Sequence, residues 1–206
     1  SHISLLGGEP LLEPRCEEIL TKIEELTECR IKLFSNALLL HKNHDWIIDH
    51  MKRGTILRLS MHVSPVNPLG KTNYKNVREF IEYAEDKVDL DSTLEISEPW
   101  GDKWFDMLKW EDNQFHPWED NDLESSWSHC TCPQMQIYNG YLWKCASIAY
   151  LRETLGSTKQ LDDPAWHKYL KYKPTAVDAP IKDIYKMADN QNHSNFICNM
   201  CPANPK

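Results

Sequence analysis

The chain has 206 residues with 23 Lys and Arg against 31 Asp and Glu, a formal net charge of −8. This acidic balance disfavours a general nucleic-acid binder, because such proteins gain affinity from clustered cations. The longest apolar run, at residues 37–40, is far shorter than the roughly 18 residues of a membrane helix, and no signal-peptide pattern opens the chain. We therefore expect a soluble, cytoplasmic protein without nucleic-acid or membrane partners.

Strand and helix patterns alternate through the first half of the chain. Strands are predicted at residues 2–6, 30–35, 55–63 and 93–97, and helices at about 12–26, 38–53 and 77–88. This order implies right-handed βαβ units and a parallel sheet or partial barrel. Ligands of such folds bind at the carboxyl ends of the strands. Those ends carry Gly7 to Pro10, Ser35 with Asn36, Ser60 with His62, and Glu98.

The second half changes in character. Residues 99–127 are rich in Trp and acidic residues without a clean period, which indicates an irregular linker or lid whose rings anchor packing more often than they stack on a ligand. Residues 135–144 form a predicted hairpin around Asn139-Gly140, a strong turn signal. Helices are expected at about 147–155 and 181–188. Residues 128–206 would then make a small, cysteine-rich domain of a β-hairpin plus helices.

Cysteine spacing is the feature with the clearest chemistry. Two of the seven cysteines, Cys16 and Cys29, stand alone, and the other five crowd the last third of the chain: Cys130, Cys132, Cys145, Cys198 and Cys201. A C-x2-C pair and cysteines flanking a hairpin can supply four thiolates to one metal centre. Spacing alone fits either zinc or an iron–sulfur cluster. It also leaves open whether Cys130 or Cys132 is the fourth ligand.

Three segments at predicted strand ends resemble motifs of radical S-adenosylmethionine (radical SAM) enzymes. The L-L-G-G-E-P-L-L run at residues 5–12 resembles the second-strand motif of that family. Ser35-Asn36-Ala37-Leu38 is similar to its T-N-G-x segment, and Leu59-Ser60-Met61-His62 resembles the strand with a serine near the cofactor's sugar and amino acid. Cys130-x9-Gly140-x4-Cys145 with the later C-x2-C is similar to the SPASM and shorter "twitch" extensions, the twitch type fitting better.

The resemblance implies a fold class and a set of ligands. The fold is α/β, a partial parallel (β/α) barrel missing its first strand, at residues 1–98, followed by a linker or lid at 99–127 and an auxiliary-cluster domain at 128–206. S-adenosylmethionine would meet Gly7, Gly8, Glu9, Pro10, Asn36 and Ser60, with the Glu9 carboxylate suited to its amino group. The clustered cysteines would hold an auxiliary [4Fe–4S] cluster.

The resemblance also implies an activity. The family uses reduced [4Fe–4S] clusters to cleave S-adenosylmethionine and form a 5′-deoxyadenosyl radical, which takes a hydrogen atom from a peptide or small-molecule substrate. An electron donor such as flavodoxin or ferredoxin would be a partner. However, the C-x3-C-x2-C triplet that holds the family's reactive cluster is absent from the sequence. We therefore expect a fragment of a radical SAM enzyme that has no catalytic residues of its own and is inactive alone.

Two other functions compete with this one. A zinc-stabilised or iron–sulfur binding module without catalytic activity would use the same cysteines, with His129 as a substitute ligand. An interaction protein would instead use the Trp-rich acidic segment as its contact surface. A metal-binding helix face is a weaker possibility, carried by His41, His44, Asp45, Asp49 and His50; we expect those side chains to be solvated. Cys16 lies on an apolar helical stripe and is expected in the core.

Overall fold

The computed structural model describes residues 2–61, 66–97, 106–130 and 134–204. The chain divides into two compact units, Ser1–Lys103 and Trp104–Lys206. Each unit has a buried apolar core of its own. We describe the two units separately.

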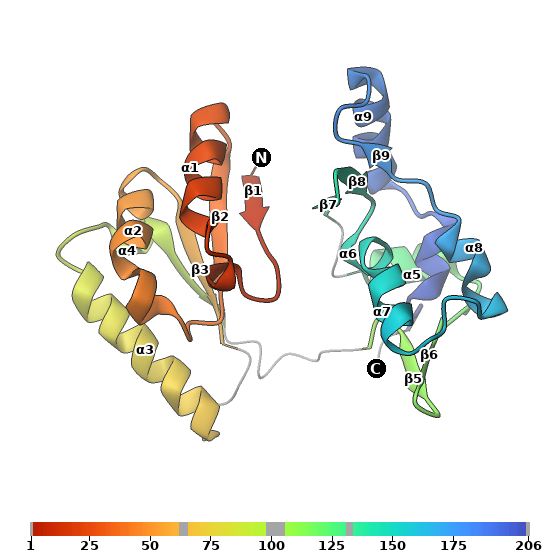
Figure 1. The fold of residues 1–206 in the computed structure, drawn as a ribbon, viewed down its shortest axis with the longest axis horizontal. Helices are drawn as coiled ribbons and strands as arrows, with labels where there is room; N and C mark the ends of the chain where they lie inside the picture. The colour runs from red at the N-terminus through yellow and green to blue at the C-terminus, as the bar shows by residue number, and fades with distance from the viewer. Residues whose placement is uncertain (1, 62–65, 98–105, 131–133, 205–206) are drawn as a thin grey trace. The chain divides into compact units, whose positions relative to one another are not determined.

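The first unit is built on a parallel sheet of four strands (Figure 1). The strands are β1 (His2–Leu5), β2 (Arg30–Ser35), β3 (Ile56–Ser60) and β4 (Leu94–Ser97), and they pair in the order of the sequence. Leu33 is paired with Leu5 of β1 and Leu57 of β3, so residues that alternate along each strand share one face. The mixed α/β class and the parallel sheet are confirmed.

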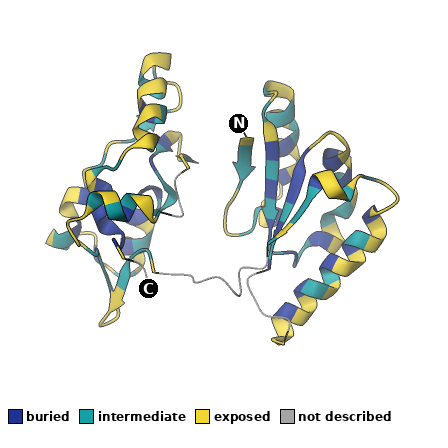
Figure 2. Ribbon diagram, turned by 180° about the vertical axis from the view of Figure 1, so that it is seen from behind, coloured by how far each residue is buried: buried dark blue, intermediate teal, exposed yellow. Residues whose placement is uncertain are grey.

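Three longer helices lie between the strands along the chain and cover one face of the sheet. They are α1 (Cys16–Leu26), α2 (Leu40–Lys52) and α3 (Pro68–Ala84), and the short η1 (Pro10–Leu12) and α4 (Leu90–Thr93) precede α1 and β4. Leu20, Ile47 and Phe80 of these helices belong to the same buried cluster as Leu33 and Leu57 of the sheet. Figure 2 shows buried residues where helices face strands and exposed residues on the outer sides of the helices.

Element positions follow the sequence patterns closely in this unit. The strand predicted at 30–35 is observed with those bounds, and Gly54 after α2 has φ +99°, the left-handed conformation expected of a helix-terminating glycine. The third helix begins at Pro68, earlier than its apolar stripe indicated, because Asn67 caps it by accepting the Leu69 N–H with its side-chain oxygen. The predicted strand at 55–63 is observed over 56–60, and its last two residues lie outside the described part of the chain.

The second unit combines short strands and helices. Its elements are β5 (Lys109–Glu111), β6 (Gln114–His116), α5 (Leu123–Ser128), β7 (Gln136–Tyr138), β8 (Tyr141–Trp143), α6 (Ala146–Ala149), α7 (Leu151–Ser157), η3 (Pro164–Trp166), α8 (His167–Leu170), β9 (Thr175–Ala176), α9 (Ile181–Asp189), η4 (Asn190–Asn192) and η5 (Phe196–Met200). The predicted hairpin is present as β7 and β8, and Asn139 and Gly140 both have positive φ, as a tight two-residue turn requires. Trp166 and Tyr169 are the largest fully buried side chains of this core.

The expectation of an irregular linker or lid over residues 99–127 is wrong for two stretches of that segment. Residues 109–116 form the β5–β6 hairpin, and residues 123–128 form α5. Both belong to the second unit. The hydrophobic period was absent because these elements are too short to repeat one, with strands of three residues and a helix of six.

No described helix is both long enough and apolar enough to cross a membrane.

Candidate functional site

The C-terminal cysteines come from three separate parts of the second unit. Cys130 follows α5, Cys145 is the N-terminal cap of α6 two residues after β8, and Cys198 lies in η5 with Cys201 at its end. Cys132 lies outside the described residues, so the choice between Cys130 and Cys132 remains a prediction. No disulfide joins the described cysteines to one another.

All four described cysteines of this group line one cavity. Its other lining residues are Met107, Ser126, Trp127, Lys144, Gln191, Ile197 and Met200. The cavity is enclosed largely by apolar side chains, and its volume is about 20 Å³. The folded chain therefore brings together sulfurs that are separated by up to 71 positions in the sequence.

Cys198 shows how close these groups lie. Its Sγ accepts a hydrogen bond of 3.4 Å from the backbone N–H of Asn195. Burial raises the pKa of the Cys198 thiol, and the Asn195 amide and the Lys144 ammonium partly oppose that rise, whereas Cys130 adds to it. Lys144 and Cys130 are thus both near enough to Cys198 to act on its thiol.

Tyr172 supports the same arrangement from another direction. Burial raises the pKa of its hydroxyl to about 12, and the charges of Cys145 and Cys198 add to that rise. Its ring also stacks on Trp143, with the ring centroids 6.1 Å apart. Trp143 lies two residues before Cys145, so this aromatic pair fixes the hairpin beside the cysteine cavity.

The spacing of the ligands bears on what the cavity can hold. Among the described residues, no three His, Cys, Asp or Glu side chains are close enough to hold one metal ion. Tetrahedral zinc would bring its sulfurs to roughly 3.8 Å from one another, given Zn–S bonds of about 2.3 Å. An iron–sulfur cluster places several iron and sulfide atoms between its thiolates and so needs them further apart.

The wide spacing of the side chains favours a cluster over a zinc ion, whereas the cavity volume favours a single ion. About 20 Å³ is roughly the room of one water molecule or ion, so a cluster would require the cysteine-bearing walls to move outward. The identity of the donors says more about the bound group than the volume does, because side chains in a protein interior pack closely and leave little empty space. The four cysteines that line this space supply the type of donor that a thiolate-bound metal group requires.

Two polar groups in the wall were not identified from the sequence. Lys144 is buried, with 4% of its surface exposed, and Gln191 has a buried Nε2 that lacks a hydrogen-bond partner within the described structure. Both bring N–H donors to a cavity lined by sulfur.

The Trp-rich segment also takes part in the site. The Asn199 carbonyl and side chain accept the backbone N–H groups of Glu119 and Asn121, at 2.9 and 2.8 Å. Ser126 Oγ donates to the Cys201 carbonyl at 3.2 Å. These bonds fasten the C-N-M-C turn to α5 and the segment before it, and Trp127 lines the cavity itself. Sequence reasoning placed this segment outside the cysteine domain.

In the first unit, the structure brings two of the predicted cofactor residues into contact. Glu9 follows β1 and Asn36 follows β2, at the carboxyl edge of the sheet. The Glu9 Oε2 accepts the backbone N–H of Asn36 at 2.7 Å, and Oε1 accepts that of Leu11 at 3.2 Å. The carboxylate therefore caps η1 and joins two strand ends. An ionised carboxylate has about four acceptor positions, so these two bonds leave capacity for another donor.

The loop after β2 is held in a defined conformation. Asn36 Oδ1 accepts the Leu38 N–H at 3.0 Å, and Asn76 Nδ2 donates to the carbonyls of Ala37 and Leu38. Ala37 has φ +68° and is fully buried. In the T-N-G segment that residues 35–38 resemble, glycine stands at this position, and glycine adopts a left-handed conformation without the Cβ penalty that alanine has.

The remaining predicted cofactor residues have simpler surroundings. Gly7 and Gly8 lie in the exposed turn after β1, with open space where a Cβ would be, and Pro10 begins η1. Ser60 ends β3 and is paired with Ser97 of β4. His62 and Glu98, at the same edge, lie outside the described residues.

A larger cavity of about 440 Å³ lies elsewhere on the first unit. It is lined by His2, Glu28, Arg30, Lys32, Ile56 and Glu95. Glu95 pairs with Lys32 at 2.7 Å and with Arg58 at 3.2 Å. Most of the lining residues lie at or near the amino ends of the strands, so this cavity contains none of the predicted cofactor residues.

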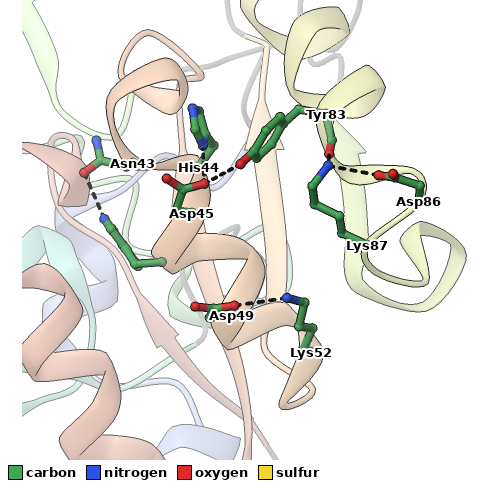
Figure 3. Close-up of polar contacts among 9 residues, drawn as sticks. Asn43, His44, Asp45, Asp49, Lys52, Tyr83, Asp86 and Lys87 are labelled. Atoms are coloured by element: carbon green, nitrogen blue, oxygen red, sulfur yellow. Dashed lines mark hydrogen bonds and ion pairs between the residues drawn. The ribbon is translucent and has the colours of Figure 1, made fainter.

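The histidine-bearing face of α2 does not gather into a metal site. His44 Nδ1 lies 2.9 Å from Asp45 Oδ1, which also accepts the Tyr83 hydroxyl at 2.5 Å, whereas Asp49 pairs with Lys52 (Figure 3). These contacts link α2 to α3 on the surface. The expectation that this face is solvated is wrong for His50, which is 2% exposed.

The two isolated cysteines are accounted for differently. Cys16 is buried in the core of the first unit, as expected, and burial next to Glu9 and Glu13 raises the pKa of its thiol to about 11. Cys29 is half-buried, and its backbone N–H donates to the Thr27 hydroxyl. Neither lines the cysteine cavity.

Comparisons of the chain with models of protein families, with curated proteins and with solved structures find no match.

Proposed function

We propose that the chain is part of a radical SAM enzyme and that its second unit holds an auxiliary [4Fe–4S] cluster. The observation that carries the proposal is the single cavity lined by Cys130, Cys145, Cys198 and Cys201. Thiolates are the ligands of iron–sulfur clusters, and bound clusters of this kind supply or relay single electrons. In this proposal the chain's own residues position the sulfurs and bring N–H donors to their surroundings.

Contacts in the first unit support the same proposal. The Glu9 carboxylate and the Asn36 segment, which resemble two separate family motifs, are joined by a direct hydrogen bond at the carboxyl edge of the sheet. Their spare acceptor and donor capacity suits the ammonium and carboxylate of S-adenosylmethionine. In this proposal the sheet is part of a (β/α) barrel. A C-x3-C-x2-C triplet encoded before Ser1 is then expected, and a reading frame without one would contradict the radical activity.

A structural zinc site is the second candidate. The small volume of the cavity favours it, since about 20 Å³ suits one ion better than a cluster. In that case the second unit is a binding module whose fold depends on the metal. Such a zinc module would not act on the peptide or small-molecule substrate that the radical enzyme requires.

Metal analysis of anaerobically purified protein distinguishes the two. We expect a brown protein with about four iron atoms per chain, and loss of most of that iron in Cys145→Ser and Cys198→Ser. Cys29→Ser is the matched control, because Cys29 lies in the first unit and should leave the iron content unchanged. A colourless protein with about one zinc per chain would reject the cluster and support the zinc module.

A further inference from the structure

Lys144 occupies an unusual position for a lysine. It follows β8 and immediately precedes Cys145, and only 4% of its surface is exposed. Burying an ammonium is costly unless hydrogen bonds and opposite charge compensate for the lost water. A lysine is therefore retained at such a position where its charge or its donors have a specific use.

Its hydrogen bonds connect two parts of the cysteine site. The Nζ donates to the carbonyl oxygens of Asn190 and of His193, the latter at 2.7 Å. Those carbonyls belong to η4 and the residue after it, the segment that leads into Cys198. The hairpin with Cys145 is thereby fastened to the chain that carries Cys198 and Cys201.

The charge of Lys144 is not neutralised by these partners. Backbone carbonyls are neutral, and both hydrogen bonds of the ammonium described above go to such oxygens. The same side chain lines the cavity with four sulfurs. Thiolates that bind a metal are negatively charged, so a metal-loaded cavity supplies the missing opposite charge.

We propose that Lys144 is the positioning residue of the cysteine site: it holds the Cys145 hairpin and the Cys198–Cys201 turn together, and its charge offsets that of the thiolate-bound group. The second part of this inference rests on the proposed metal site, whereas the first does not. Lys144 acts on the site by holding its two cysteine-bearing segments together and by its charge, and it is not itself a metal ligand.

The positioning role is tested in the metal-free full chain by thiol cross-linking. Dibromobimane becomes fluorescent when it bridges two nearby thiols, and mass spectrometry identifies which cysteines it joins. In Lys144→Met we expect bridging of Cys145 to Cys198 or Cys201 to be about tenfold slower, since a hydrogen bond to a charged group is worth at least that factor. Lys182→Met is the control, because it makes the same exchange on the exposed side of α9.

The outcomes separate this inference from the proposed function. Unchanged bridging in Lys144→Met overturns the positioning role, even if the protein binds iron. Slow bridging in a protein that binds neither iron nor zinc supports the positioning role and overturns the metal site and the charge-offset role. If Lys144→Met does not fold, Lys144→Arg decides, because arginine keeps the charge and the hydrogen-bond donors. Bridging at the wild-type rate in Lys144→Arg supports the role, and loss of bridging in a folded Lys144→Arg protein overturns it.

The charge role has its own readout in the loaded protein. We expect Lys144→Met to lower the reduction potential of the cluster relative to the wild type, because removing a nearby positive charge disfavours adding an electron. Lys182→Met should leave the potential unchanged. A potential that is the same in all three proteins would overturn this part of the inference.

Discussion

Gln191 brings a buried amide nitrogen to the cysteine cavity without giving it a hydrogen-bond partner in the described structure. An unsatisfied buried donor costs roughly 1–3 kcal/mol of stability. Such a group in a native structure calls for an explanation, for example an ion or ligand that it faces. A metal group bound as proposed would supply the acceptor that the Gln191 amide lacks in the described structure.

Gln191→Met separates the stability cost of this donor from its role toward the metal group. In the metal-free chain we expect the free energy of unfolding to stay the same or to rise by about 1 kcal/mol, because the orphan donor is removed while its volume is kept. In the loaded chain we expect the metal to be lost faster to a chelator. Urea unfolding and metal release measure the two. Gln114→Met is the control, because Gln114 is the exposed first residue of β6. Metal release as slow as in the wild type would contradict this role.

At the scale of elements, Glu24 joins α1 to α2 and to the start of β3. Its Oε1 accepts His50 Nδ1–H at 2.7 Å and the Thr55 hydroxyl at 2.8 Å, and its Oε2 accepts Arg53 Nε–H at 2.8 Å. Arg53 Nη2 also lies 2.8 Å from His50 Nδ1. When His50 Nδ1 donates to Glu24, both Nδ1 and Arg53 Nη2 carry protons, so neither can accept from the other. We therefore assign the hydrogen bond of His50 Nδ1 to the Glu24 carboxylate.

This network predicts a pH dependence. Burial pushes the pKa of Glu24 upward, but the hydrogen bonds from His50, Arg53 and Thr55 outweigh it, so the pKa lies below its ordinary value. The carboxylate then stabilises the fold above the unfolded pKa of about 4.3, and that contribution is lost as the pH falls through the folded value. We expect Glu24→Gln to cost about 1–3 kcal/mol at pH 7 and to weaken the acid dependence of unfolding.

Glu17→Gln is the matched control for that measurement, because Glu17 lies on the same helix and is exposed. Its stability should change little between pH 7 and 3 relative to the wild type. If both variants showed the same acid dependence as the unmodified chain, the stabilising role of the Glu24 network would be refuted.

At the scale of the whole molecule, the division into two units predicts where each perturbation is felt. The proposed metal site lies within Trp104–Lys206, and the Glu24 network lies within Ser1–Lys103. Because each unit has its own core, we expect metal loading to slow amide hydrogen exchange in the second unit and Glu24→Gln to speed it in the first. Exchange measured by mass spectrometry checks both. Slowing in α1 and α2 on metal loading would contradict this separation.

The sequence by itself determined the regular part of the fold. Strands such as β2 and helices such as α2 carry long enough apolar periods to reveal themselves, and Asn139-Gly140 requires the positive φ values that the hairpin turn has. Cys16 was assigned to the core for the same reason. The spacing of the later cysteines predicted a shared metal centre, and the four that the structure describes line one cavity.

The tertiary structure decided which other residues meet them. Lys144, Gln191 and Asn199 reach the cysteine cavity or fasten its turn through contacts between segments as far as 78 positions apart, and no local period records such contacts. The hydrogen bond of Glu9 with Asn36 likewise depends on the pairing of β1 with β2. Local pattern fixes an element because neighbouring residues share its backbone geometry, whereas a site depends on how distant elements pack.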